Sequence, residues 1–419
     1  MFWTSNAEFE SRLQRTEAKL LEYAKRKHAA NSFDVKAFDT FIPRSAVPCL
    51  KSTKNEKDKT LKIHCIKATS NKDLYDTAPF PLVNLHGYMN AGAYFYRNLG
   101  GLCDYFPAVY AVDMLGWGFS SRVPFRQVKN SGSVESAEDF HVESLEAWRA
   151  ENNIEKMVLS GHSFGGYIAV AYAERYPERI DQLILLSPIG VPDPPDPDSE
   201  DRRNMSLKFQ MFLGVFRMFF ECTTPGAFLR TLTEYRASAL VSGYVDRRLP
   251  EVSDAEEAQT LADFLFLNAS LRGSGEYFLR SLFTSSIFAK SPLLFRVPTL
   301  QVRAVNFVYG TQDWMDVSGG MDAGSLAHKV SRKQDGSSSS ISTTDVNVFL
   351  VPNAGHLLTI ENPESVNACM IGIAGGKMGY PRGGRPMRMN LDYSKELDES
   401  WLNCVRETLE DRQKRSTAE

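Results

Sequence analysis

Apolar residues in this chain gather in short continuous runs that are separated by turns and by segments of helical spacing. Such runs predict β-strands that are buried on both faces, as in a parallel sheet. The runs lie at residues 80–85, 109–112, 157–160, 183–187, 306–310 and 346–351. Strands that alternate with helices predict an α/β fold with a mostly parallel central sheet and helices on both faces.

Both ends of the chain carry helical patterns. Residues 8–28 form a charged amphipathic helix with apolar positions at Leu13, Leu20, Leu21 and Tyr23. We expect this helix to pack on the domain, with contact to a lipid surface as the alternative. A closing helix is predicted at residues 391–409, and polar stretches at about 331–345 and 372–390 predict loop insertions.

At 419 residues, one large α/β domain with an inserted helical cap fits better than two independent domains. We expect an N-terminal helix and extension at residues 1–60, core at 61–188 and 295–410, and the cap at 189–294. Residues 205–220 of the cap are rich in phenylalanine and methionine, which suit a flexible acyl chain. We assign Phe212, Phe216 and Met218 to substrate binding, with packing on the core as the alternative.

A candidate nucleophile follows the run at 157–160. The sequence Gly161-His162-Ser163-Phe164-Gly165 leads directly into helical spacing at residues 167–172. Strand, sharp turn and helix in this order predict a nucleophile elbow, which exposes a serine hydroxyl at the edge of a parallel sheet. The flanking glycines are needed because larger side chains would collide with the strand or the helix. Ser163 is therefore the predicted catalytic serine.

A catalytic serine needs a base and an acid, which follow it along the chain in this architecture. His356 lies in the loop after the run at 346–351, just before a helix start at Asn362-Pro363-Glu364. Asp313 follows the run at 306–310 and is the predicted acid. Asp316 and Asp322 are its rivals.

Two backbone amides are predicted to form an oxyanion hole. One belongs to Phe164, directly after the nucleophile, and the other to Tyr88, in the loop that His86-Gly87 begins. We expect His86 to hold this loop by a side-chain hydrogen bond. Gly87 and His162, which lie next to the predicted reacting groups in the sequence, are predicted to support the site. The stretch from Asp113 to Ser120 is interpreted as a structural turn.

These motifs together resemble the α/β-hydrolase superfamily, and more narrowly its CGI-58-like branch. That branch holds the ABHD4 and ABHD5 group, plant relatives and the yeast cardiolipin deacylase group. The likeness covers about residues 60–365, is closest to plant-type members, and is carried by stretches at 86–98, 113–122, 143–149, 275–283 and 309–315.

The resemblance implies hydrolysis of phospholipids or lysophospholipids and, in some members, acyl transfer from acyl-CoA to lysophosphatidic acid. Members often carry His-x4-Asp at the catalytic histidine, whereas this chain has Glu361 five residues after His356, which weakens the acyltransferase expectation. One animal member has lost the serine and acts as a lipase co-activator. Ser163 is present here, so hydrolysis stays available.

Composition limits the partners. A net charge of -3 and a pI near 6.2 give no electrostatic basis for binding nucleic acid. The six cysteines have no metal-binding spacing and suit reduced thiols, and no metal or other cofactor is implied. No secretory signal or long apolar span is seen, so the sequons at Asn204 and Asn268 are expected to stay unglycosylated. We expect a cytoplasmic protein that associates peripherally with a membrane or lipid droplet.

The predicted function is hydrolysis of lipid carboxylic esters by Ser163, His356 and Asp313. A non-catalytic lipid-surface scaffold or lipase regulator is the alternative from another class. A hydrolase of small soluble esters would keep the same site, but it would have a shorter and less apolar cap.

Overall fold

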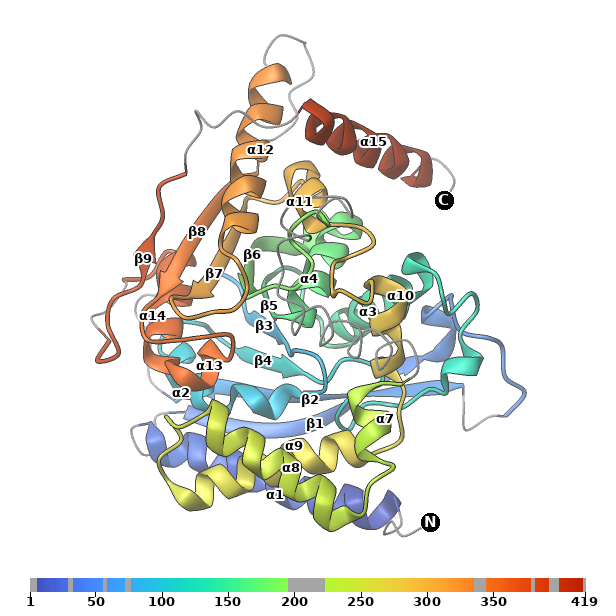
Figure 1. The fold of residues 1–419 in the computed structure, drawn as a ribbon, viewed down its shortest axis with the longest axis vertical. Helices are drawn as coiled ribbons and strands as arrows, with labels where there is room; N and C mark the ends of the chain where they lie inside the picture. The colour runs from blue at the N-terminus through green and yellow to red at the C-terminus, as the bar shows by residue number, and fades with distance from the viewer. Residues whose placement is uncertain are drawn as a thin grey trace, which may run out of the picture.

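The computed structural model describes residues 6–28, 33–55, 59–71, 77–194, 223–334, 344–377, 381–391 and 399–416. Within these residues one sheet of nine strands runs in the order β1-β2-β4-β3-β5-β6-β7-β8-β9 (Figure 1). The strands are β1 Phe33–Pro43, β2 Thr60–Ser70, β3 Leu82–Leu85, β4 Val109–Val112, β5 Met157–His162, β6 Ile180–Leu186, β7 Ala304–Gly310, β8 Asp345–Val351 and β9 Met387–Arg388. Strands β4 to β8 pair in parallel, and β1, β2 and β9 are antiparallel additions at the two edges.

The six predicted strands correspond to β3 to β8, and the predicted mostly parallel α/β fold is confirmed. Every residue of β3, β4, β5 and β7 is buried, as expected for interior strands covered on both faces. In β1, by contrast, most residues are exposed or half-buried. Its sequence therefore lacks the continuous apolar run that marks the central strands.

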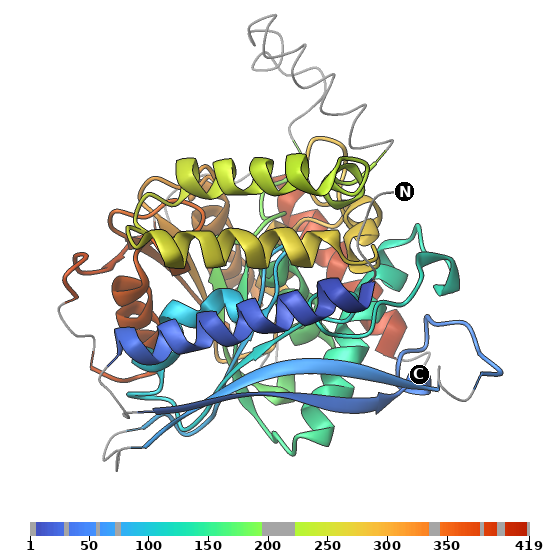
Figure 2. The ribbon, with the colours of Figure 1, turned by 90° about the horizontal axis from the view of Figure 1, so that it is seen from below.

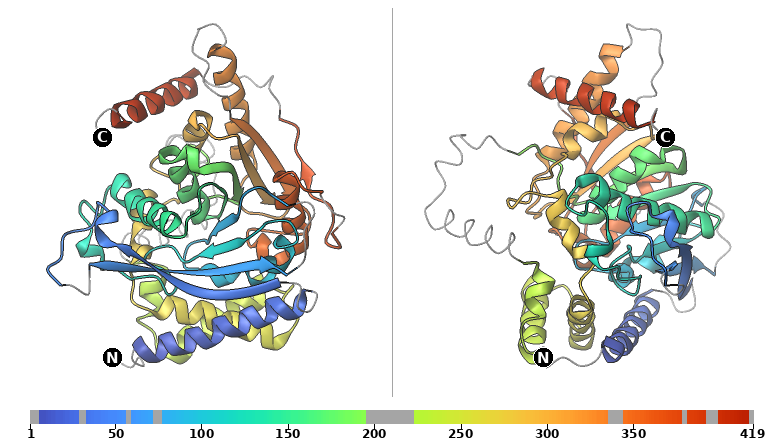
Figure 3. Two further views of the ribbon diagram at one scale, coloured as in Figure 1. Left: turned by 180° about the vertical axis from the view of Figure 1, so that it is seen from behind. Right: turned by 90° about the vertical axis from the view of Figure 1, so that its right-hand side faces the viewer.

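Helices cover both faces of the sheet. They are α1 Asn6–Lys27, α2 Tyr96–Leu102, α3 Val134–Glu151, α4 Phe164–Arg175, α7 Pro225–Leu229, α8 Glu234–Arg248, α9 Ala255–Ser270, α10 Leu279–Leu282, α11 Leu293–Arg296, α12 Ser318–Gln334, α13 Leu358–Glu361, α14 Pro363–Ile373 and α15 Glu399–Ser416. One apolar core joins the sheet to α3, α4, α11 and α12, and a second joins it to α1, α2, α9 and α14. Figure 3 shows the first group of helices and the pair α1 and α9 on opposite sides of the sheet.

The N-terminal helix packs on the domain, as predicted. Helices α8, α9 and α1 lie side by side (Figure 2). The Phe9 ring meets the Phe266 ring of α9 edge to face at 6.2 Å, and Arg12 forms an ion pair with Glu234 of α8. The apolar stripe of α1 is thus buried against cap and core rather than left for a lipid surface.

Helices α7 to α10 lie between β6 and β7, where the sequence predicts the cap. The predicted substrate residues Phe212, Phe216 and Met218 lie outside the described residues. Most of the predicted loop at 331–345 also lies outside them, but α12 continues to Gln334 and β8 begins at Asp345. In the second predicted insertion, Met387–Arg388 adds β9 to the sheet edge.

The predicted bounds of the closing helix were wrong. Leu391 is not helical, and α15 spans Glu399–Ser416. Leu402 and Val405 of α15 are buried, and Trp401 meets the Phe295 ring at 6.3 Å. The residues that pack against the region around α11 therefore lie in α15, further along the chain than the predicted start of the helix at Leu391.

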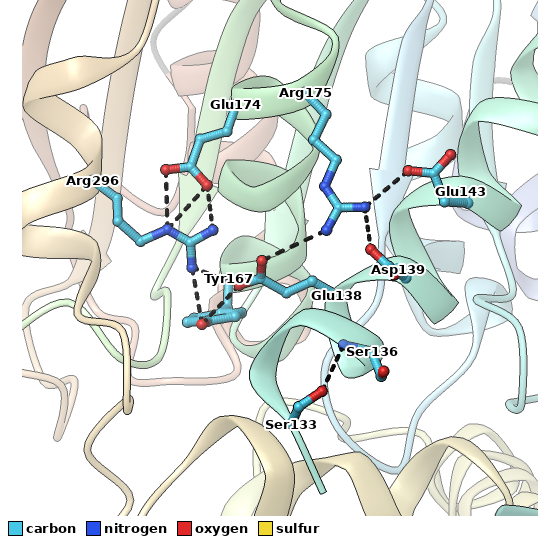
Figure 4. A network of polar contacts seen from close by, with 9 residues as sticks. All are labelled: Ser133, Ser136, Glu138, Asp139, Glu143, Tyr167, Glu174, Arg175 and Arg296. Atoms are coloured by element: carbon cyan, nitrogen blue, oxygen red, sulfur yellow. Dashed lines mark hydrogen bonds and ion pairs between the residues drawn. The ribbon is translucent and has the colours of Figure 1, made fainter. Parts of the chain in front are cut away.

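A buried ion network fixes α4 against its neighbours (Figure 4). Arg296, at the end of α11, donates to Glu138 of α3 at 2.7 Å and to the Tyr167 hydroxyl of α4 at 2.9 Å. The same guanidinium pairs with Glu174 at the other end of α4. The network therefore joins the segment that returns from the cap to the helix that follows Ser163.

Candidate active site

Ser163 occupies a sharp turn between β5 and α4. Its φ of 52° and ψ of -114° are unusual for a residue with a side chain, a strain that recurs at functional sites. A Cβ on Gly161 would lie 2.3 Å from the Gly165 carbonyl oxygen, and one on Gly165 would lie 2.5 Å from that of Leu85. Only glycine fits at these two positions, which is why the turn can be so tight.

The structure brings Ser163, His356 and Asp313 together from the ends of β5, β8 and β7, three strands of the parallel part of the sheet. Ser163 Oγ lies within hydrogen-bonding distance of His356 Nε2, at 3.1 Å. On the other side of the ring, His356 Nδ1 lies 3.3 Å from Asp313 Oδ1. This arrangement suits an imidazole that takes a proton from the serine while the carboxylate orients it.

Asp313 remains ionised in this setting. Burial acts to raise the pKa of its carboxyl, but interactions with His356, the Ser187 hydroxyl and the Met315 amide outweigh burial, and the pKa is lowered. Its rival Asp316 instead accepts a hydrogen bond from the Ser318 amide at 2.8 Å, at the start of α12. The third candidate, Asp322, lies further along α12.

The predicted oxyanion donors flank the serine. Phe164 is the first residue of α4, so its amide has no acceptor within the helix. Tyr88 follows Gly87, where an added Cβ would lie only 2.9 Å from His162 Nδ1 and at a contact distance of 3.5 Å from Ser163 Cβ. The rings of Tyr88 and Phe164 meet edge to face at 6.4 Å. The absence of a side chain at Gly87 thus lets this loop pack closely on His162, next to Ser163.

Two buried histidines support these loops. His86 Nδ1 donates to the Gly87 carbonyl at 2.8 Å, and its Nε2 accepts from the Met114 amide at 3.1 Å. His162 Nε2 donates to the carbonyl of His356 at 2.8 Å, and burial lowers the pKa of His162 to about 3. Both imidazoles therefore act as neutral hydrogen-bonding groups.

Glu361 binds the loop that carries His356. Its carboxylate accepts a hydrogen bond from the Gly355 amide, directly before the histidine. Burial raises the pKa of Glu361, although the bond from Gly355 opposes this. The glutamate in the His-x4-Glu pattern is thus turned back onto the histidine loop.

Comparison with known proteins identifies the family to which this fold belongs. The family profile described as alpha/beta hydrolase fold matches residues 81–363. The chain belongs to the α/β-hydrolase family.

Relatives place this α/β-hydrolase in the CGI-58-like branch, as the sequence predicted. A 1-acylglycerol-3-phosphate O-acyltransferase of Arabidopsis thaliana is 31% identical, with 74% of this chain and 72% of that protein covered. Protein ECM18 of Saccharomyces cerevisiae is 25% identical, with 73% of each covered. The human 1-acylglycerol-3-phosphate O-acyltransferase ABHD5 is 29% identical, with 68% of this chain and 75% of that protein covered. Fold and relatives together support an enzyme of hydrolytic or acyl-transferring type with a lipid-related activity.

Solved structures agree on the fold. Wild-type Cfl2 from Burkholderia cenocepacia matches this α/β-hydrolase with a TM-score of 0.52 at 16% identity, over 75% of this chain and 92% of that one. At this identity the likeness shows the fold alone.

Reasoning from the sequence assigned no role to two residues at the site of this α/β-hydrolase. Trp314 is 59% exposed, and its ring centroid lies 5.1 Å from that of His356, at the rim of the site. Ser187, at the end of β6, has a φ of 44° and helps to keep Asp313 ionised. The sequence signals that could have indicated them are positional: Trp314 follows the predicted acid, and Ser187 lies at the end of a predicted strand.

Within the described ranges, no group of three or more His, Cys, Asp or Glu side chains is placed to hold a metal ion. Likewise, none of the helices in those ranges has the length and apolar character needed to span a membrane.

Proposed function

We propose that this α/β-hydrolase cleaves carboxylic esters of phospholipids or lysophospholipids through an acyl-enzyme on Ser163. The observation that carries the proposal is the chain of contacts from Ser163 Oγ through His356 to Asp313. These three groups have the geometry of a nucleophile, a general base and an orienting acid.

In the proposed first step, Ser163 Oγ attacks the ester carbonyl carbon while His356 Nε2 accepts the hydroxyl proton. The carbonyl oxygen becomes an oxyanion, which the amides of Tyr88 and Phe164 stabilise. When the tetrahedral intermediate collapses, the bond to the alcohol oxygen breaks and His356 returns its proton to that oxygen. An ester of Ser163 remains.

In the second step, His356 takes a proton from an acceptor, whose oxygen attacks the acyl carbonyl carbon. The bond between this carbon and Ser163 Oγ then breaks, and His356 returns the proton to Ser163 Oγ. Water as the acceptor yields a free fatty acid. A lysophospholipid hydroxyl as the acceptor yields a new ester, and acyl-CoA would then be the acyl donor. The Arabidopsis and human relatives are named as acyltransferases, which is the reason to test this second acceptor.

Exposed apolar and basic side chains of the cap helix α8 support a lipid surface as the place of action. Tyr235, Leu240 and Tyr244 of α8 are 83%, 51% and 41% exposed. Arg236 and Arg248 of the same helix are also exposed. Aromatic and apolar side chains among basic ones suit the interface of a membrane or lipid droplet that carries anionic headgroups.

Ser163→Ala tests the proposal. We expect the wild-type protein to be labelled by a fluorophosphonate and to release fatty acid from phosphatidylcholine, cardiolipin or lysophosphatidic acid, and both signals to vanish in the variant. Ser160→Ala, at a buried position in β5 three residues earlier, is the control and should keep both. A folded wild-type protein that neither labels nor cleaves would favour the scaffold or regulator. Labelling without cleavage of any lipid would favour a small soluble ester.

A further inference from the structure

A buried asparagine of the cap contacts the proposed oxyanion loop. Asn268 lies in the last turn of α9, and only 2% of its surface is exposed. Its Nδ2 donates a hydrogen bond to the carbonyl oxygen of Met89 at 3.1 Å. Met89 directly follows Tyr88, whose amide is one of the two proposed oxyanion donors. The cap thus reaches the loop beside the reacting atoms.

The backbone of Met89 needs such a contact. Tyr88 and Met89 are the central residues of a turn in which the Asn90 amide donates to the Gly87 carbonyl at 3.2 Å. Met89 has a φ of 58°, in the left-handed region where this position of a turn normally carries glycine or asparagine. A methionine stays there only if its surroundings hold it. The bond from Asn268 to the Met89 carbonyl is one such restraint.

The amide group of Asn268 can take only one orientation. Its Oδ1 accepts from the Gly118 amide at 3.1 Å and from Arg122 Nη2 at 2.9 Å. If the group were turned over, its NH2 would face these two donors and its oxygen would face a carbonyl oxygen. The donor to Met89 is therefore fixed by the loop that follows β4.

We propose that Asn268 is a positioning residue that fixes the Met89 carbonyl and so directs the Tyr88 amide toward the oxyanion. This inference rests on the proposed function. The oxyanion hole is then complete only when the end of α9 is seated on the core. Cap placement and transition-state stabilisation are coupled through a single side chain.

Asn268→Asp tests this inference with little change in shape. The carboxylate keeps the two accepted bonds but cannot donate to Met89. Asn268→Ala removes the donor without adding charge. Ser270→Ala is the control, because the Ser270 hydroxyl donates to the Phe266 carbonyl of its own helix at 2.6 Å. It also removes the same sequon, Asn268-Ala269-Ser270, as the two Asn268 variants.

For both Asn268 variants we expect kcat on p-nitrophenyl butyrate to fall about 10- to 100-fold while KM changes by less than about 2-fold. Inhibition by an alkyl trifluoromethyl ketone, whose adduct carries an oxyanion, should weaken in parallel. Ser270→Ala should match the wild-type protein. Adding Met89→Gly to Asn268→Ala should restore part of the rate, since glycine takes a positive φ without support.

Unchanged kcat and ketone inhibition in folded Asn268 variants would overturn the inference and leave the proposed function intact. A rise in KM at constant kcat would also overturn it, since that result places Asn268 in substrate binding. No rescue by Met89→Gly would remove the argument from backbone strain and overturn it too. If the wild-type protein shows no Ser163-dependent activity, the proposed function fails and this inference fails with it.

Discussion

In the proposed mechanism, the carboxylate of Asp313 determines which nitrogen of His356 carries the proton. With Nδ1 3.3 Å from Asp313 Oδ1, the proton belongs on Nδ1, and Nε2 is free to accept from Ser163. Asp313→Asn offers an NH2 group to Nδ1 and favours the other tautomer, in which Nε2 can no longer act as a base. By analogy with serine proteases, we expect kcat to fall about 10⁴-fold with KM nearly unchanged.

Asp316→Asn is the matched control for that measurement. Asp316 is the rival that the sequence left open, and its carboxylate accepts from the Ser318 amide, an acceptor role that asparagine Oδ1 can keep. We expect kcat of this variant to stay within about 3-fold of the wild-type value. A large loss in Asp316→Asn together with a small one in Asp313→Asn would reverse the assignment.

At the scale of residues, the sequence was enough to predict candidate site residues that lie in short local motifs. Ser163 and His356 each follow a buried strand, so short motifs were enough to indicate them. The sequence alone favoured Asp313 but kept Asp316 and Asp322 as rivals, because the choice depends on which carboxylate meets His356 in space. Asn268 was noticed only as a sequon. Its contact with Met89 joins positions 179 residues apart, and no local pattern indicates it.

The packing of α3, α4 and α11 depends on one buried cation. The Arg296 side chain is 5% exposed and pairs with Glu138 and Glu174, whose side chains are 5% and 14% exposed. Arg296→Met removes the cation and leaves two carboxylates buried without it. We expect the free energy of unfolding to fall by about 3–5 kcal/mol, measured by urea denaturation at pH 7.

Arg303→Met provides the comparison at the surface. Arg303 also pairs with a carboxylate, Asp181 at 2.6 Å, but its side chain is 59% exposed. Water and salt screen such a pair, so we expect a change of about 0–1 kcal/mol. Equal losses of unfolding free energy in Arg296→Met and Arg303→Met would show that burial does not determine how much the Arg296 network stabilises the protein.

At the scale of elements, the central strands, which are mostly buried, agree with the sequence-based prediction. Elements at the edge of the sheet and at the end of the chain depart from it. The six central strands are mostly apolar because helices cover both faces of the sheet, so they were predicted to within a few residues. β1 is largely exposed, and it lies in the segment assigned to an N-terminal extension. The start of the closing helix was predicted too early, because the spacing of apolar residues does not reveal which of them will contact α11.

At the scale of the whole molecule, α1 joins the cap to the core. Arg12 and Lys27 pair with Glu234 of α8 and Glu257 of α9. Toward the sheet, Glu17 lies 3.2 Å from His64 Nε2 in β2. Because α1 meets the sheet through this histidine, the protonation state of His64 affects how firmly cap, N-terminal helix and sheet hold together.

His64 is surrounded by carboxylates on three sides. Asp39 of β1 lies 2.6 Å from its Nδ1, Glu17 of α1 contacts its Nε2, and Asp113 of the loop after β4 adds negative charge. The cation Lys62 pairs with Asp39 at 3.4 Å. Burial acts to lower the pKa of His64, but the carboxylates outweigh it and raise the pKa from 6.5 to about 9. The imidazolium is therefore the form that the folded protein prefers.

The folded protein binds this proton more tightly than the unfolded chain, so the stabilisation is complete below pH 6.5 and is lost as the pH rises through about 9. The full difference is on the order of 3 kcal/mol. We expect the stability gap between the wild-type protein and His64→Gln, from urea unfolding, to shrink by that amount between pH 6 and 9.5. Lys62→Gln, which removes a surface cation from the same carboxylate, should shift stability by less than about 1 kcal/mol at every pH. If the wild-type and His64→Gln curves run parallel, His64 carries no extra proton in the folded state, and its protonation does not contribute to holding α1 on the sheet.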